Sequence, residues 1–186
     1  MAVNLLRDDI DSPIGVIAIA ASEGRLVALD FGESATRLET DLAARYGGAQ
    51  LERRRDPFGV SRRIEAYLAG DLGALDTIEV DPGGTPFQRQ VWTALRRVPA
   101  GRTITYAEMA RTIGRPTAQR AVGAANGRNP VSIVIPCHRM VGTDGTLTGY
   151  GGGLARKRWL LQHEGAGAPR PAPRGRDSVR LATRIA

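Results

Sequence analysis

The feature that most constrains the fold is a change of pattern at Asp81-Pro82-Gly83-Gly84. Before these residues the apolar positions form short β-branched runs, and after them they recur at helical spacing. Because proline and glycine favour an irregular connection, we predict a linker over 81–84. The sequence therefore predicts two domains, 1–80 and 85–165, followed by a basic and disordered tail over 166–186.

The first domain has the pattern of a small α/β unit with an antiparallel sheet. Apolar runs at 14–21 and 25–31 flank the turn residues 22–24, which predicts a β-hairpin. The run at 75–80 predicts one more strand.

Two helices are predicted in the same domain from their capping residues. Ser34 is expected to cap a helix that runs to about Tyr46. Asp56, followed by Pro57, is expected to start a second helix that ends near Gly70.

The second domain is predicted to be mostly helical. Thr85 with Gln88, and Thr105 with Glu108, have the spacing of capping boxes, so each pair predicts a helix start. Thr117 is expected to cap a further helix that runs to Asn126. The last two helices and their glycine-containing turn predict a helix-turn-helix within a winged-helix-like domain.

The third of these helices has two distinct faces. Ala118, Ala121, Val122 and Ala125 are expected to face the core, whereas Arg120, Gly123 and Gly127 share another face. A face of small residues permits either the close approach of a DNA backbone or close packing against another helix. The segment alone leaves both interpretations open.

Cys137 is the one cysteine of the chain, and His138 follows it directly. The run at 131–135 predicts a buried strand that ends at Pro136, and neighbouring residues on a strand point to opposite faces. A bend after Pro136 or a bridging water is therefore needed to bring imidazole and thiol together. A lone cysteine is either a small buried apolar residue or a nucleophile. His163 and Glu164 are both candidates to orient His138.

Composition narrows the class of protein. The 26 Lys and Arg against 19 Asp and Glu give a formal net charge of +7, which permits a nucleic-acid partner. All these cations except Lys157 are arginines. A single cysteine excludes an internal disulfide and a thiolate zinc cluster. No apolar run is long enough to cross a membrane and the start lacks a secretory signal, so a cytoplasmic location is expected.

The segment Ile133-Val134-Ile135-Pro136-Cys137-His138-Arg139 resembles the active-site signature of the O6-alkylguanine-DNA alkyltransferases, or methylated-DNA–protein-cysteine methyltransferases. The resemblance is strong over 85–165 and loose in the first domain, chiefly at 11–15. The further motifs that match in order and spacing are Thr105-Tyr106, Arg120-Ala121-Val122-Gly123, Asn129-Pro130, Gly149-Tyr150 and Trp159-Leu160-Leu161 with His163-Glu164-Gly165.

The resemblance implies a catalytic role for each matching residue. Cys137 would attack the alkyl carbon, His138 would deprotonate it through a water, and Glu164 would orient His138. Tyr106 would donate a hydrogen bond to the base, and Asn129 would tie the helix-turn-helix to the active-site strand. His163 would then be a bystander.

The resemblance also implies a substrate pocket and a DNA surface. Backbone amides at Tyr150 and Gly151 would point at O6, and carbonyls at Cys137 and Met140 would read the exocyclic amine. Gly151, Gly152 and Gly153 suggest a roomy pocket. The other implied pocket residue is Thr148. The implied DNA contacts are Thr117, Gln119, Arg120, Ala121, Gly123 and Ala124, with Arg120 filling the space of a flipped-out nucleotide.

The first domain is implied to be ribonuclease-H-like and to act as a scaffold. It contains no Cys and no His, so the structural zinc of some relatives is not expected, and no cofactor is needed. The expected partner is double-stranded DNA carrying O6-alkylguanine, bound by a monomer without a protein partner. Activity on O4-alkylthymine, cooperative binding along DNA, and roles for Arg139 and the tail are left open.

Three other classes of function remain as alternatives. A damage-recognition module would lack the nucleophile, which Cys137 argues against. A cysteine hydrolase would turn over small acyl substrates without DNA. A transcription factor would carry more polar side chains along 118–127 for reading bases.

Overall fold

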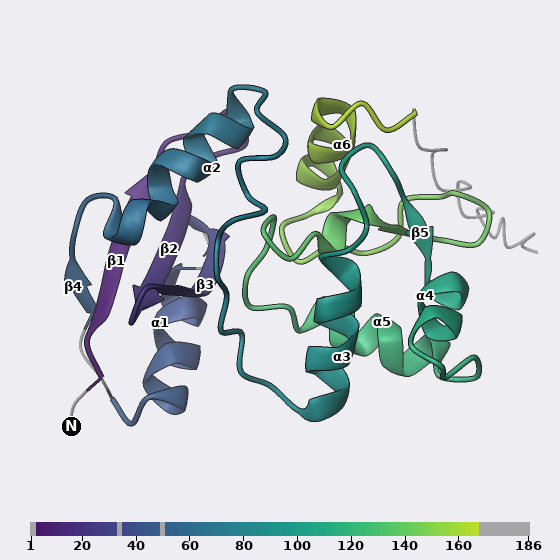
Figure 1. Ribbon diagram of the computed structural model, residues 1–186, viewed down its shortest axis with the longest axis horizontal. Coiled ribbons are helices and arrows are strands. Elements are labelled where there is room, and N and C mark those ends of the chain that lie inside the picture. The colour runs from purple at the N-terminus through teal and green to yellow at the C-terminus, as the bar shows by residue number, and fades with distance from the viewer. Residues whose placement is uncertain (1–2, 33–34, 49–50, 168–186) are drawn as a thin grey trace, which may run out of the picture.

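The computed structural model describes residues 3–32, 35–48 and 51–167 (Figure 1). An α/β half (purple to blue) lies beside a mostly helical half (teal to yellow), which confirms the predicted fold class. Within the described ranges, no helix combines the length and apolar character that a membrane span requires.

The N-terminal half contains a four-stranded sheet in the order β3-β2-β1-β4. Its strands are β1 (Leu5–Ile10), β2 (Ile17–Ser22), β3 (Arg25–Phe31) and β4 (Leu51–Arg53). The predicted hairpin is confirmed as β2 and β3, with Glu23 (φ 49°) and Gly24 (φ 81°) in the tight turn. Strand β1 was not predicted, and β4 pairs with it in parallel, so the sheet is mixed at that edge.

Helices cover both faces of this sheet. They are α1 (Ala35–Arg45) and α2 (Val60–Leu68). Because side chains alternate along a strand, Ala18 shares a buried cluster with Leu42 of α1 on one face. On the other face, Ile19 shares a larger cluster with Ile64 of α2 and Leu95 of the C-terminal half. The second face of the sheet therefore belongs to a core that spans both halves of the chain.

Two predictions in this half are wrong, and a third falls outside the described residues. Asp56 does not cap α2: it has a left-handed backbone (φ 48°) and precedes a short 3-10 turn, Pro57–Gly59, after which the helix begins. The run at 75–80 is not a strand, because only Val80 forms a bridge, to Leu26. Ser34 lies outside the described residues.

The C-terminal half contains four helices and a short two-stranded parallel sheet. The helices are α3 (Pro86–Leu95), α4 (Tyr106–Thr112), α5 (Gln119–Gly127) and α6 (Leu154–His163). The strands are β5 (Ile104–Thr105) and β6 (Met140–Val141). Both capping boxes are confirmed, since the side chains and backbone of Thr85 and Gln88, and of Thr105 and Glu108, bond reciprocally.

The start of α5 differs from the prediction. Its first flanking residue is Ala118, without a side-chain cap, so Thr117 is not the N-cap. Val122 and Ala125 are buried as expected in a cluster with residues of α3 and α4, but Ala121 is exposed.

The predicted strand at 131–135 is wrong, and the error matters for the site. Val131 forms a single parallel bridge to Leu29 on the free edge of β3. The backbone of Leu29 bonds to the carbonyl of Pro130 (2.9 Å) and to the amide of Ser132 (3.0 Å). The chain then turns at Ile133, which has a positive φ of 68° despite its branched side chain. The β-branched residues are buried as a turn rather than as a strand.

The capping box at the start of α3 gives a direct test of this local structure. Thr85→Ala removes the oxygen that accepts from the Gln88 amide (3.2 Å), so we expect the free energy of unfolding to fall by about 1 kcal/mol. Urea denaturation measures the change. The control is Thr112→Ala, because the Thr112 hydroxyl bonds only to a carbonyl within its own helix (2.9 Å). Equal effects of the two substitutions would contradict the capping role.

Candidate active site

Cys137 begins a 3-10 turn, Cys137–Arg139, directly after Pro136. The bend that the sequence analysis required is therefore present. The thiol is buried (4% exposed), and the Asn129 side-chain amide donates to its sulfur at 3.0 Å. The same amide donates to the carbonyl of Ile135 (2.8 Å), and the Asn129 oxygen accepts from the Val131 amide (3.0 Å). Asn129 thus fixes the turn that presents the nucleophile.

His138 contacts Glu164 in the interior of the protein. Its Nε2 lies 2.9 Å from Glu164 Oε1, and both side chains have no exposed surface. A carboxylate accepts hydrogen bonds, so Nε2 carries the proton and Nδ1 is the basic nitrogen. Nδ1 is buried and has no protein partner among the described residues. Of the two candidates that the sequence left open, the structure brings Glu164 to His138.

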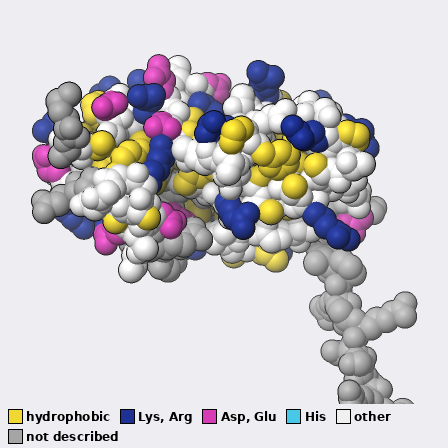
Figure 2. Space-filling model, turned by 90° about the horizontal axis from the view of Figure 1, so that it is seen from below, with side chains coloured by type: hydrophobic (Ala, Val, Ile, Leu, Met, Phe, Trp, Pro, Cys, Tyr) yellow, Lys and Arg dark blue, Asp and Glu magenta, His cyan; other side chains and the backbone are white. Residues whose placement is uncertain are grey.

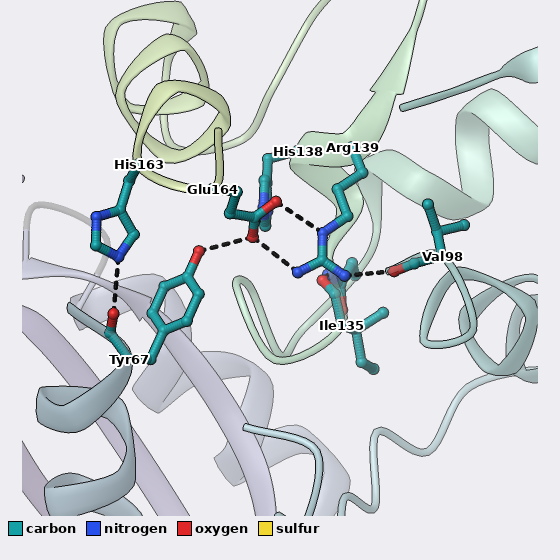
Figure 3. A network of polar contacts seen from close by, with 8 residues as sticks. Tyr67, Val98, Ile135, His138, Arg139, His163 and Glu164 are labelled. Carbon is teal, nitrogen blue, oxygen red and sulfur yellow. Dashed lines mark hydrogen bonds and ion pairs between the residues drawn. The ribbon is translucent and has the colours of Figure 1, made fainter. Parts of the chain in front are cut away.

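Arg139 completes this cluster (Figure 3). Its Nε donates to Glu164 Oε2 at 2.9 Å and its Nη2 to Oε1 at 2.7 Å, which is the bidentate geometry that favours arginine over lysine. Its Nη1 donates to the carbonyl of Val98. The role of Arg139, which the sequence left open, is to hold the carboxylate in place.

His163 has a different environment. Its Nε2 lies 2.7 Å from the carbonyl oxygen of Tyr67, and its ring stacks on Trp159 with centroids 4.8 Å apart. It makes a contact between α6 and α2 and does not reach His138 in this arrangement (Figure 3).

Burial and pairing set the charge states of the cluster. Burial alone would raise the pKa of Glu164, but the hydrogen bonds and charges of His138 and Arg139 hold it well below its usual range. Burial lowers the pKa of His138, and Glu164 opposes that shift only in part. At neutral pH the pair is therefore a carboxylate and a neutral imidazole, the form that accepts a proton.

A buried lysine lies close to the thiol. Lys157 on α6 is fully buried, and its ammonium donates to the carbonyls of Met140 (2.5 Å) and Thr148 (2.9 Å). Burial lowers the pKa of Lys157 to about 8, so most molecules still carry the positive charge at neutral pH. Burial raises the pKa of Cys137, and this shift is opposed by Asn129 and by the charge of Lys157.

The residues of the predicted substrate pocket surround this turn. The Tyr106 hydroxyl lies 2.9 Å from the Thr148 hydroxyl, which joins the start of α4 to the 148–153 loop. The Tyr150 ring makes an edge contact with His138, with centroids 6.4 Å apart. The Tyr150 hydroxyl is buried without a hydrogen-bond partner in the described part of the chain. Met140 is buried, and its carbonyl is already engaged by Lys157.

The glycines of this loop do not simply widen the pocket. A Cβ at Gly152 would lie 2.3 Å from the Phe31 ring, so this position is closely packed. Gly153 has a positive φ of 86° at the start of α6. A Cβ at Gly151 or at Gly153 would meet no heavy atom within 4 Å. The inference of open space from three glycines was therefore wrong for Gly152 alone.

The predicted DNA-contacting residues lie on and beside α5. Gly123 is half-buried, and a Cβ there would lie 3.6 Å from the Tyr106 ring, so this glycine packs against α4 in the way that the sequence left open. The remaining residues of the predicted set are all exposed: Thr117, Gln119, Arg120, Ala121 and Ala124.

The surface around α5 is strongly basic. Figure 2 shows Lys and Arg side chains surrounding an apolar patch on the C-terminal half. Between 85 and 130 the only acidic residue is Glu108. The arginines of this segment are Arg89, Arg96, Arg97, Arg102, Arg111, Arg115, Arg120 and Arg128. A phosphate backbone is the partner that such a surface favours.

Two residues of the site were missed from the sequence. Tyr67 of α2 donates its hydroxyl to Glu164 Oε1 (2.7 Å), and nothing in its local pattern distinguishes it from a core tyrosine. Lys157 had one available signal, since it is the single lysine of an arginine-rich chain. No group of three or more His, Cys, Asp or Glu suited to a metal occurs in residues 3–32, 35–48 and 51–167.

The fold and site together define a DNA-binding protein with a buried thiol beside a paired histidine and carboxylate. Two family models match the chain, "6-O-methylguanine DNA methyltransferase, ribonuclease-like domain" over residues 6–82 and the "DNA binding domain" of the same name over residues 86–166. The chain belongs to the methylated-DNA–protein-cysteine methyltransferase family.

Individual relatives cover most of the chain. The methylated-DNA–protein-cysteine methyltransferase of Salmonella typhimurium is 48% identical over 166 residues, 88% of this chain and 97% of the relative. A crystal structure of Mycobacterium tuberculosis OGT in complex with DNA has a TM-score of 0.73 at 40% identity, covering 91% of this chain and 96% of that one. The Pyrococcus kodakaraensis enzyme has a TM-score of 0.68 at 29% identity, with coverages of 87% and 99%.

The buried lysine gives the prediction for this site. Lys157→Met removes a cation near the thiol and leaves two buried carbonyls without a donor. We expect the pKa of Cys137 to rise and the free energy of unfolding to fall by about 2 kcal/mol or more. Because tyrosinate also absorbs in the ultraviolet, the thiolate titration is the difference in absorbance between each protein and its Cys137→Ser counterpart, which lacks the one cysteine.

The control for this substitution is Arg158→Met, which removes a cation from an exposed position on the same helix. It should leave the thiol titration unchanged. An unchanged titration in Lys157→Met would show that the lysine serves packing alone.

Proposed function

We propose that this protein repairs DNA by transferring the alkyl group of O6-alkylguanine to the sulfur of Cys137. The observation that carries the proposal is a buried series: Cys137 and His138 lie in a turn that Asn129 holds, and Glu164 at the end of α6 contacts His138. A nucleophile, a base and an orienting carboxylate are the groups that such a displacement needs.

The transfer is a single displacement at the alkyl carbon. The thiol proton passes to His138 Nδ1 through a bridging water, and the sulfur forms a bond to the alkyl carbon. The bond from that carbon to O6 breaks, and its electron pair stays on the guanine oxygen. Glu164 keeps the His138 ring in the tautomer that leaves Nδ1 free to accept the proton.

The departing guanine needs donors for its negative charge. We assign the Tyr106 hydroxyl, held by Thr148, as the donor to the base. Backbone amides at Tyr150 and Gly151 are assigned to O6. The carbonyls of Cys137 and Met140 are assigned to the exocyclic amine; the first now accepts from the Met140 amide and the Asn126 side chain (3.4 Å), and the second from Lys157 (2.5 Å).

The target atom lies inside the base stack, so the nucleotide must rotate out of the duplex. We propose that α5 enters the minor groove and that Arg120 fills the vacated space. The exposed small residues Ala121 and Ala124 allow close approach. The exposed arginines Arg111, Arg115 and Arg128 are assigned to phosphates, which they contact without reading sequence.

The product is a thioether on Cys137, and the chemistry of the site offers no step that cleaves it. We therefore propose that each molecule acts once, as a monomer on duplex DNA, without a metal or cofactor, in the cytoplasm. The same proposal extends to two further properties: activity on O4-methylthymine and cooperative binding along DNA.

A titration of repaired DNA against protein tests this function. A duplex with one O6-methylguanine is incubated with increasing protein, and restored guanine is scored by cleavage with a methylation-blocked restriction enzyme. We expect one guanine restored per active molecule and none with Cys137→Ser. Product in excess of protein would contradict single use, and no product with the unchanged protein would contradict the proposed transfer.

Arg120 gives a test of nucleotide flipping. Arg120→Ala should slow transfer from the duplex by roughly tenfold or more, because unstacking costs a few kcal/mol and loses its compensating contact. Transfer from a single-stranded oligonucleotide, where that cost is smaller, should change much less. The control is Arg111→Ala, which likewise removes one cation, from the exposed surface of α4. Equal slowing on both substrates would show that Arg120 acts only through phosphate attraction.

A further inference from the structure

Tyr67 connects the N-terminal half to the buried carboxylate of the site (Figure 3). The residue has no exposed surface, and its hydroxyl donates to Glu164 Oε1 at 2.7 Å. The same oxygen accepts from His138 Nε2 (2.9 Å) and from Arg139 Nη2 (2.7 Å). One carboxylate oxygen therefore receives donors from three side chains, of which only Tyr67 comes from the N-terminal half.

Two contacts with His163 hold Tyr67 in position. His163 Nε2 lies 2.7 Å from the Tyr67 carbonyl oxygen, and the two rings meet edge to face with centroids 5.1 Å apart. His163 directly precedes Glu164, so the end of α6 holds both the ring and its acceptor. The ring contact holds the Tyr67 side chain and the hydrogen bond holds its backbone, so the two interactions can be removed separately.

Sharing one oxygen has a consequence for the base. The charged and titratable groups around His138 are Glu164, Arg139, Lys157, the adjacent Cys137 and Tyr150, whose ring meets the imidazole edge to face. A carboxylate beside an imidazole favours the imidazolium, which cannot accept the proton of a thiol. Donors from Tyr67 and Arg139 spread the negative charge, so Glu164 orients His138 without holding it protonated.

We propose that Tyr67 is a positioning residue for the transfer reaction, through which the N-terminal domain keeps the Glu164 carboxylate aligned and His138 in its neutral form. This proposal rests on the proposed function. It extends the role of the N-terminal domain from a scaffold to a part of the reaction site.

The direct test is Tyr67→Phe, which keeps the ring and removes the donor. The single-turnover rate of methyl transfer is measured against pH for both proteins. Because the loss of the donor concentrates charge next to His138, its pKa should rise. The acidic limb of the profile should then move to higher pH by about half a unit, a threefold loss of rate on that limb. At pH values above the acidic limb, the rates of the two proteins should become more similar.

The control is His163→Phe, which retains the ring contacts and removes the bond to the Tyr67 carbonyl. We expect it to lower the melting temperature without moving the acidic limb. An unmoved limb in Tyr67→Phe, or equal shifts in both variants, would overturn the proposal, because the contact would then serve only to dock the two halves.

A second measurement keeps the proposal independent of activity. The chain has two histidines, so the imidazole signals of His138 and His163 can be assigned and titrated by NMR in the free protein. Tyr67→Phe should raise the pKa of His138, and an unchanged or lower value would overturn the proposal. If the unchanged protein transfers no methyl group, the proposed function fails, but this titration still decides the role of Tyr67.

Discussion

The buried carboxylate of Glu164 is the constraint on which the rest of the site depends. A carboxylate without exposed surface is stable only when donors compensate its lost hydration, and here Tyr67, His138 and Arg139 supply them. These donors come from α2 and from the turn that carries the nucleophile. The hydrogen bonds to this one carboxylate therefore hold three features in place: the His138 imidazole, the turn after Pro136 and the contact between the two halves.

The Cys137 thiol is placed by a second constraint, the outer edge of strand β3 in the N-terminal sheet. Leu29 bonds to the backbone on both sides of Val131, and Asn129 then holds the turn and the thiol together. The edge of the sheet holds this segment at Val131, and the buried carboxylate holds it at His138 and Arg139. The N-terminal half therefore contributes to the geometry at Cys137 as well as to the core.

Much of the architecture could be predicted from local signals, and the site largely from the resemblance. The capping boxes, the hairpin and the helical character of the second half depend on neighbouring residues, which a sequence displays directly. The turn at 131–135 was misread because its β-branched residues favour a strand, whereas pairing with Leu29 ends after one residue. The role of Tyr67 was missed because its acceptor, Glu164, is 97 residues away along the chain, and no local pattern indicates such a contact.

The most direct measurement is the intact mass of the protein before and after incubation with a duplex that carries a single O6-methylguanine, followed by peptide mapping. The account predicts that every active molecule gains one methyl group, that the group is on Cys137, and that Cys137→Ser gains none. Binding to the duplex without any change in mass would contradict the account. The chain would then recognise the damaged base without removing its alkyl group.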